Sequence, residues 1–410
     1  MAPKRKTSAG KKHRKQGDRV VEGFERLIKK FDPTAAGNIL RSHVHEPFQI
    51  DQSEVKRDLL HDLRSNLLPQ LGGQIINLLL LLDPNRLRED PGGHLKLILD
   101  IQSELDQTLS RIESATFSYP HATEPLFDSI EFKDQDLKEI KWFRLDGLYW
   151  RINGEFLVVV TRIFLESNEL LQQMKLSTAE FHDQPDIDYT REQIVYYASS
   201  SLEGIELAIE WLDGSEFDLV QLEWPSEKDG FSENMDDLLS LTNRTSHLEP
   251  GNITGESAPG DDPAIKLSKS LLPVFKLCRL LFKKLSKRGL NKEHLPLFTK
   301  ASSVELEHVA EMGGVVSYGL RNLLSVLRSV DRARDRLAHP DGAMMAAKIQ
   351  DHVDTAVSLI AHYFVPLIPD SDTLPIQNHY KDWLATWSSQ FRLAIRNFLN
   401  AALSFDEGTL

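Results

Sequence analysis

The chain has 410 residues, of which 41% are hydrophobic and 27% charged, and its formal net charge is −13. This length and composition are sufficient for a sizeable buried core divided over two or three domains. The negative charge argues against a folded body that binds nucleic acid generally, because such a surface is basic.

Membrane-spanning and disulfide-bonded classes are also disfavoured. The apolar runs, such as residues 78–82 and 156–160, are far shorter than the roughly 20 residues that cross a bilayer. No apolar segment follows the basic N-terminus, so a secretory signal is not expected. The single cysteine excludes an internal disulfide and a metal cluster of thiolates. We therefore expect a soluble intracellular protein of the nucleus or cytoplasm, with no cofactor.

Residues 1–17 are basic and poor in apolar side chains, which predicts a disordered arm. Its cations form two clusters that resemble a bipartite nuclear-import signal. These residues are Lys4, Arg5, Lys6, Lys11, Lys12, Arg14 and Lys15. A solvated tail, and a direct contact with nucleic acid or with an acidic membrane surface, are the alternatives.

Residues 18–212 are predicted to form an N-terminal helical bundle. An amphipathic helix is expected from Asp18 to Phe31, and a second from near Asp51 or Ser53, kinked or restarted at Pro69. The continuation to Leu82 is apolar on all sides, which predicts a segment buried all round.

The clearest helix spans residues 94–115. Its apolar side chains recur at three- and four-residue steps and form one stripe. They are Leu95, Ile98, Ile101, Leu105, Leu109 and Ile112. Because such a stripe needs a facing apolar surface, it favours helices packed on helices.

A long periodic run from about residue 134 to 175 is also predicted to be helical. Three consecutive valines at 158–160 favour a strand, but the flanking residues keep helical spacing. The pattern Thr190-x-x-Gln193 resembles a capping box and predicts the start of the next helix.

Residues 213–263 are rich in acids, Gly, Ser, Asn and Pro, and are predicted to be an acidic polar linker between domains. Leu219, Leu222 and Trp224 predict a short helix within it that docks on the first half. Residues 238–241 predict another short helix.

Residues 264–404 are predicted to form a C-terminal helical bundle, followed by a tail at 405–410. Helices are expected at residues 265–287, from a capping box at Ser302-x-x-Glu305, from 341 to 366, and from 376 to 403. The last helix carries Trp383, Trp387 and Phe391, which suit either a core or a partner interface.

Sequence motifs that carry chemistry are absent. No nucleophile elbow, phosphate-binding loop or dinucleotide fingerprint is present. His43 and His45 lack further metal ligands, and Cys278 lies on an apolar stripe, which predicts a buried, unreactive thiol. We therefore predict no catalytic, cofactor-binding or metal residue, and a protein that is not an enzyme.

A basic face on the helix at 265–287 is the candidate partner surface. Its residues are Lys276, Arg279, Lys283, Lys284, Lys287 and Arg288. It suits an acidic partner or a membrane surface. The alternative is a core helix whose lysines are merely solvated, which the wide apolar face favours.

Several segments are similar to an expanded family of uncharacterised helical proteins in rust fungi. They are LKLILDIQSELDQTLSRI at 95–112, LDGLYWRINGEF at 145–156, LAIEWLDGSEFDLVQLEW at 207–224, LLPVFKLCRLLFKKLSKRGLNKEHLPLFTKASS at 271–303 and YFVPLIPDSDTLPIQNHYKDWLATWSSQF at 363–391. The family has no assigned activity, so the resemblance implies a helical fold and no site residue. More distantly, the helix pattern resembles the architecture of cyclin-D1-binding protein 1 and vinculin-like bundles, which is an analogy of shape.

The sequence thus predicts an all-α protein of two packed helical-bundle halves. The function expected is a non-enzymatic protein-interaction module with an unknown protein partner, and the nucleus is one of its two expected locations. The alternatives are a nucleic-acid-associated protein that acts through the basic arm, and an enzyme whose site is not visible in the sequence.

Overall fold

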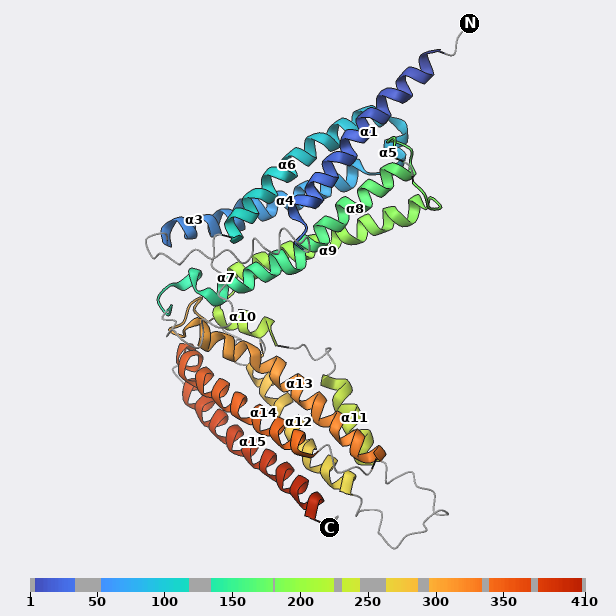
Figure 1. Ribbon diagram of the computed structural model, residues 1–410. Helices are drawn as coiled ribbons and strands as arrows, with labels where there is room; N and C mark the ends of the chain where they lie inside the picture. The colour runs from blue at the N-terminus through green and yellow to red at the C-terminus, as the bar shows by residue number, and fades with distance from the viewer. Residues whose placement is uncertain are drawn as a thin grey trace. The chain divides into compact units, whose positions relative to one another are not determined.

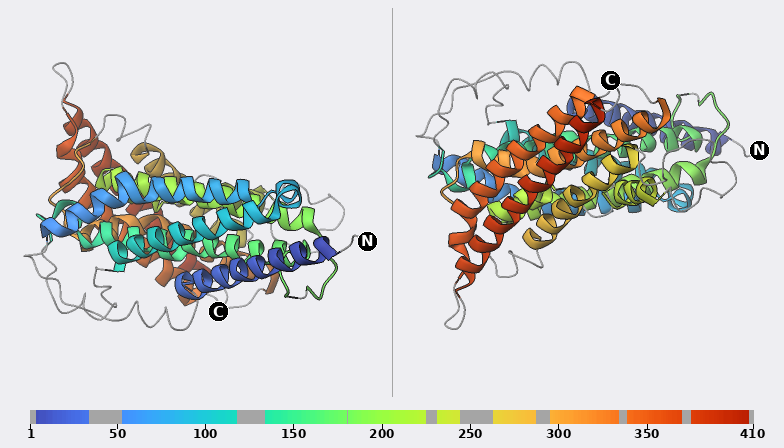
Figure 2. Two further views of the ribbon diagram at one scale, coloured as in Figure 1. Left: turned by 90° about the horizontal axis from the view of Figure 1, so that it is seen from above. Right: turned by 90° about the horizontal axis from the view of Figure 1, so that it is seen from below.

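The computed structural model describes residues 4–33, 53–117, 134–179, 181–224, 231–243, 263–286, 295–333, 339–369 and 375–407, with side chains near some helix ends, including those of residues 4–12, outside the description. It forms two compact units. The first comprises Met1–Glu131 and Glu139–Asp213, and the second Phe132–Lys138 and Gly214–Leu410. No strand occurs among the described residues (Figures 1 and 2), which confirms the predicted all-α class.

The first unit is a bundle of long antiparallel and parallel helices. Helix α1 packs against α6 and α8, helix α4 packs against α6 and α9, and α8 packs against α9, so these helices surround one core (Figure 1). The helices of this unit are α1 (Lys4–Phe31), α3 (Ser53–Asp62), α4 (Leu68–Leu81), α5 (Pro84–Glu89), α6 (Pro91–Phe117), α7 (Trp142–Tyr149), α8 (Leu157–Gln173) and α9 (Ile187–Asp213).

Two π-helical turns join helices of this unit end to end. The turn η2 (Leu63–Leu67) connects α3 to α4, and η5 (Trp150–Phe156) connects α7 to α8. The valines at 158–160 therefore lie in a helix, as their flanking residues predict. The residues before Trp142 form a 3₁₀ turn at Lys138–Ile140, so the helix begins later than residue 134.

Helix α6 buries its predicted apolar stripe completely. All six stripe residues, from Leu95 to Ile112, have less than a tenth of their surface exposed. The buried Gln102 on the same helix donates a hydrogen bond from Nε2 to the Val20 carbonyl of α1 at 2.8 Å. Gly23 allows this approach, because a Cβ there would lie 2.1 Å from the Gln102 Oε1 atom.

Two predictions for this unit were wrong. Helix α4 is not buried all round, since Ile76 and Leu80 are 44% and 49% exposed. Helix α9 begins at Ile187, where Asp186 Oδ1 accepts a hydrogen bond from the Tyr189 N–H at 2.9 Å. Thr190 is not the cap: its buried hydroxyl accepts a hydrogen bond from Gln173 Nε2 at 2.9 Å.

The predicted disorder of residues 1–17 is also wrong for residues 4–17, because α1 begins at Lys4. The last turns of this segment contact the bundle. Gln16 Nε2 donates a hydrogen bond to the Gly92 carbonyl at 3.1 Å. At Gly17 a Cβ would lie 1.9 Å from the Leu176 carbonyl oxygen, so only glycine fits there. Contacts of this kind order a helix that composition alone would leave unfolded.

The second unit is built around four long helices. Helix α12 packs against α13 and α15, and α14 packs against α13 and α15, while α11 lies on α12 and α13 (Figure 1). The helices of this unit are α10 (Glu216–Leu222), α11 (Phe231–Asn243), α12 (Pro263–Leu285), α13 (Ser303–Ala333), α14 (His339–Leu359) and α15 (Ile376–Glu407).

Much of the predicted linker is part of this second unit. The first unit ends at Asp213, and α10 packs against α13 rather than on the first half. Its apolar residues Phe217, Leu219 and Val220 are fully buried, and burial of this kind outweighs the acidic composition around them. Residues 244–262 of the predicted linker lie outside the described residues.

The N-terminus of α13 is capped by Ser302 and Glu305, as predicted, and also by Asp134. Glu305 Oε2 accepts hydrogen bonds from the Ser302 N–H at 2.7 Å and the Ser302 hydroxyl at 2.8 Å. Buried Asp134 adds a second cap, because its Oδ1 accepts a hydrogen bond from the Ser303 N–H at 2.8 Å. Helix α15 ends at Glu407, so part of the predicted tail is helical.

Candidate binding surfaces

Helix α12 exposes a row of cations that we call the α12 stripe. It consists of four exposed cations, Lys269, Lys276, Arg279 and Lys283, and of the exposed Leu280 among them. The helix contains no acidic residue, and within the described part of the chain none of these four cations forms an ion pair. Leu280 is 47% exposed in the middle of the stripe. The arrangement is a cationic surface with one apolar contact point.

The opposite face of α12 belongs to the core of the second unit. Its buried residues are Leu267, Leu271, Val274, Phe275, Cys278, Leu281 and Leu285. Trp387 of α15 donates a hydrogen bond from Nε1 to the Leu277 carbonyl of α12 at 2.9 Å and stacks on Phe391 at 4.8 Å between ring centroids. The apolar face of α12 is therefore occupied, as are the aromatic rings of Trp387 and Phe391.

The predicted partner residue Lys284 differs from the others in its surroundings. Its Nζ lies 4.7 Å from the ring centroid of Tyr380 and 5.5 Å from that of Trp383, both on α15. A cation over an aromatic face is attracted to it. Lys284 thus fastens α12 to α15 and is not part of the stripe. Lys287 and Arg288 lie outside the described residues.

The basic N-terminal cluster begins helix α1. The side chains of Arg14 and Lys15 are exposed, and the other cations of the cluster, from Lys4 to Lys12, lie on helical backbone with side chains outside the description. Asp18, just after the cluster, accepts hydrogen bonds from the Thr178 N–H at 2.6 Å and hydroxyl at 2.9 Å. The cluster therefore extends from a helix that is fixed to the first unit from about residue 13 onward.

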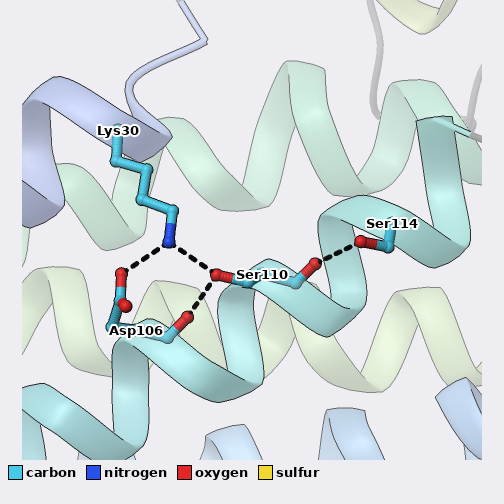
Figure 3. A network of polar contacts seen from close by, with 4 residues as sticks. All are labelled: Lys30, Asp106, Ser110 and Ser114. Carbon is cyan, nitrogen blue, oxygen red and sulfur yellow. Dashed lines mark hydrogen bonds and ion pairs between the residues drawn. The ribbon is translucent and has the colours of Figure 1, made fainter.

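A shallow groove of about 580 Å³ runs between α1 and α6. At its edge Lys30 donates hydrogen bonds from Nζ to Asp106 Oδ1 at 2.8 Å and to the Ser110 hydroxyl at 2.7 Å, and Ser110 and Ser114 continue the network along α6 (Figure 3). The Lys30 and Asp106 side chains are largely solvated, so this pair is worth about 0.2–1 kcal/mol. Its role is to hold the end of α1 on α6.

A cleft of about 210 Å³ in the first unit brings together residues that the sequence analysis missed. Its apolar lining residues are Leu60, Leu145, Leu148, Trp211 and Leu212, and its polar lining residues are Arg57, His61, Arg64, Glu139 and Arg144. The residues come from three parts of the chain that are far apart in the sequence: α3 with η2, the 3₁₀ turn at Lys138–Ile140 with α7, and α9. No motif spacing connects them, so only the fold could reveal this site.

Trp211 is the fixed point of that cleft. Its Nε1 donates a hydrogen bond to the Arg144 carbonyl at 2.8 Å, and the Arg144 guanidinium donates to the Leu212 carbonyl at 3.1 Å. The Arg151 guanidinium lies over the indole, 3.6 Å from a ring centroid. These contacts hold the indole and Arg144 in place, and Arg144 is only 5% exposed.

Within the described residues, Cys278 is the one residue that the sequence offered for chemistry, and it is not part of a reactive centre. Cys278 is buried, and burial raises the pKa of its thiol, which keeps it protonated. His43 and His45 lie outside the described residues. Among the residues that are described, no three His, Cys, Asp or Glu side chains are placed to hold a metal ion. None of the described helices is long and apolar enough to span a membrane.

Fold and surfaces together define a helical protein of two bundles. Comparison with known protein families divides the chain in the same way. Residues 56–213 match a family model described as a domain of unknown function, DUF8723, and residues 215–400 match another, DUF8721. The division between the two models falls at the division between the two compact units. No curated protein and no solved structure matches the chain.

Proposed function

We propose that the protein is a non-enzymatic helical interaction module that binds an acidic segment of a protein partner through the α12 stripe. The observation that carries this proposal is the segregation of charge. In a chain of net charge −13, one helix of the second unit has an outer face of cations and no acidic residue.

The spacing of the stripe suits an elongated acidic ligand. Lys269, Lys276 and Lys283 are seven residues apart, so they follow one another along the helix at intervals of about 10.5 Å. Exposed Leu280 adds an apolar contact between the last two lysines. A partner helix with acidic residues at the same interval and one apolar residue complements this pattern.

An acidic protein segment fits better than a membrane or a nucleic acid. An amphipathic helix enters a membrane with its apolar face, and that face of α12 is buried in the bundle. A nucleic acid carries a charge on every phosphate and extends beyond the stripe, so it would also meet the negative field of the remaining protein. A partner segment needs to contact only the stripe.

Neutralising the stripe tests the proposal. The variant Lys276→Gln, Arg279→Gln, Lys283→Gln is compared with the matched variant Arg321→Gln, Lys348→Gln, Lys381→Gln, which removes the same charge from exposed positions on α13, α14 and α15. Full-length proteins are used as bait in quantitative affinity purification. Partners with acidic segments are expected to be depleted about tenfold by the stripe variant alone, because each lost contact costs about 0.2–1 kcal/mol.

Equal recovery of all partners by the two variants would contradict the proposal. So would recovery that depends on nuclease treatment and on the N-terminal cluster, since that result favours a nucleic-acid-associated protein. The bait lacking residues 1–12 distinguishes this outcome, because its α1 keeps the contacts of Gln16 and Gly17 with the bundle.

We further propose that the N-terminal basic cluster is a nuclear-import signal. Its two groups of cations support this, as does their position at the end of a helix whose following turns are fixed to the bundle. A full-length fluorescent fusion is expected to accumulate in the nucleus. Replacing Lys4, Arg5, Lys6, Lys11 and Lys12 by alanine should abolish this accumulation, and an unchanged distribution would show that the cluster is a solvated tail.

A further inference from the structure

Helix α9 exposes an acidic row on the surface of the first unit, which we call the α9 face. The helix has no basic residue after Arg191. The exposed residues of the face follow one another at three- and four-residue steps, so they lie on one side of the helix. They are Glu192, Tyr196, Ser199, Glu203, Glu206, Leu207 and Glu210. The face is therefore acidic, and it includes one leucine that is 39% exposed.

Two carboxylates in the middle of the α9 face are available to a partner. Glu203 and Glu206 form no ion pair within the described part of the chain. Helix α4 packs along α9 and has no charged residue in Leu68–Leu81, so it does not neutralise them. The core of the unit lies on the opposite side of α9, where Ile205 and Ala208 are buried. A second molecule can therefore approach the face without disturbing the bundle.

The α9 face repeats the pattern of the α12 stripe with the opposite charge. Each surface has two exposed charges about one helical turn apart and an exposed leucine beside them. In antiparallel order each charge meets its opposite and leucine meets leucine, with a mismatch along the helix axis of at most about 1.5 Å, the rise of one residue. The three pairs are Glu203 with Lys283, Glu206 with Arg279, and Leu207 with Leu280. Because the match includes the apolar residue, it is more specific than a match of charge alone.

Net charge restricts where two copies of this chain can attract each other. Two molecules of net charge −13 repel each other on average. Attraction is confined to places where a cationic surface of one copy meets an acidic surface of the other. The α12 stripe is a cationic surface on a helix that contains no acidic residue, and the α9 face is an acidic surface of matching pattern.

We propose that the α12 stripe of one copy of this chain binds the α9 face of a second copy in antiparallel order. The inference rests on the proposed function, and it identifies the chain itself as an acidic partner of the stripe. The contact is weak and reversible, because exposed ion pairs each contribute little and are screened by salt.

Charge reversal in the full-length chain tests this proposal, with self-association measured by sedimentation velocity at low salt over a wide range of protein concentration. The α9 reversal is Glu203→Lys, Glu206→Lys, and the α12 reversal is Arg279→Glu, Lys283→Glu. Each variant has two surfaces of the same sign. Each should therefore self-associate about tenfold more weakly than the native chain, since like charges placed opposite each other repel.

The matched control is Glu25→Lys, Glu104→Lys, which makes the same change of net charge at exposed positions on α1 and α6. It should self-associate at least as tightly as the native chain, because it keeps both surfaces and lowers the overall repulsion. Circular dichroism checks that every variant keeps its helices.

Mixing the two reversal variants provides the rescue. The cationic α12 stripe of the α9 reversal then meets the acidic α9 face of the α12 reversal, and the two reversed surfaces also match. The mixture should associate about as tightly as the native chain, and so should a single chain that carries all four changes. Added salt should weaken native self-association. A contact that did not depend on opposite charges would strengthen instead, because salt screens the repulsion between net-negative chains.

The inference and the proposed function fail in different ways. A native chain that stays monomeric at every concentration would overturn the inference, as would a mixture that associates no better than either reversal alone. The proposed function stands in both cases if the stripe variant still loses acidic partners in affinity purification. Self-association that the α12 reversal leaves unchanged would overturn the inference, and equal partner recovery by the stripe variant and its control would overturn the proposed function as well.

Discussion

Gly147 and Trp211 illustrate how closely single residues are fitted in the first unit. A Cβ at Gly147 would lie 2.1 Å from the Trp211 Cζ2 atom, and the indole cannot move away because its Nε1 is hydrogen-bonded to Arg144 and Arg151 covers its face. Glycine is a poor helix former, so its presence in α7 is explained by this contact. The contact also fixes the position of Trp211 in the cleft that it lines.

Replacing Gly147 by alanine should therefore destabilise the protein by about 1–3 kcal/mol, the usual range for overpacking a core. Gly73→Ala is the matched control, because a Cβ at Gly73 meets nothing within 4 Å. That change should stabilise α4 by about 0.5–1 kcal/mol. Urea denaturation of both variants measures the difference, and a Gly147→Ala protein as stable as Gly73→Ala would refute the fitted contact.

His308 and His352 form a stacked pair between α13 and α14, with ring centroids 3.9 Å apart. Each ring nitrogen Nε2 faces the carbonyl oxygen of the other residue, at 3.3 Å and 3.0 Å, and a carbonyl accepts, so each Nε2 carries a proton. Burial, and then the neighbouring His308, lower the pKa of His352 below its ordinary value of 6.5. The folded state therefore resists protonation of His352.

This lowered pKa predicts how stability depends on pH. The unfolded chain takes up the proton first as the pH falls, so the contribution to stability is complete above about pH 6.5 and is lost progressively below it. Thermal unfolding from pH 8 to pH 5 should show a steeper loss in the native protein than in His352→Gln. Exposed His182, changed to glutamine, serves as the control. Parallel pH profiles for all three proteins would show that the pair does not titrate in this way.

At the scale of the element, the start of α13 is built from distant parts of the chain. Ser302 and Glu305 form the capping box that the local pattern predicts, and Glu305 Oε1 also accepts a hydrogen bond from the Tyr363 hydroxyl at 2.7 Å. Asp134 caps the same turn from 169 residues away. Local patterns cannot predict a partner so remote, since its residue type is common and its spacing carries no signal.

Asp134→Ala should lower the free energy of unfolding by about 1–2 kcal/mol, the usual cost of losing a helix cap. Asp136, two residues away, pairs with Lys300 where both side chains are 80% exposed. Asp136→Ala should therefore change stability by less than about 1 kcal/mol. Chemical denaturation measures the free energy of unfolding of both variants. Similar decreases in the two would mean that Asp134 contributes no more than a surface charge.

The helices themselves were largely predictable because apolar periodicity records the face that each helix buries. The stripe of α6 and the cap of α13 are examples. Composition was a weaker guide. It made α10 part of a linker, although three apolar residues anchor it in the second unit, and it made residues 4–17 disordered, although Gly17 and Gln16 fix that helix to the bundle.

At the scale of the whole molecule, the two units carry different kinds of surface. The first has a small cleft whose residues come from three distant parts of the chain, around Arg64, Arg144 and Trp211, which is why the sequence did not reveal it. The second has a continuous cationic row on one helix, and this row was visible in the sequence because its members are close neighbours. Sequence reasoning placed Lys284 in the same row, and only the structure shows its contacts with Tyr380 and Trp383.

The salt dependence of binding to the α12 stripe tests the central proposal most directly. The probe is a synthetic helical peptide with glutamates at seven-residue intervals and one leucine, and its Kd is measured by fluorescence anisotropy from low to high salt. The native protein should bind with an affinity that falls steeply with salt, because exposed charges are screened. The Lys276→Gln, Arg279→Gln, Lys283→Gln variant should bind about tenfold more weakly at low salt and with a shallower salt dependence, while the Arg321→Gln, Lys348→Gln, Lys381→Gln control should match the native protein. Equal affinity and equal salt dependence for the two variants would contradict the assignment of the stripe as the binding surface.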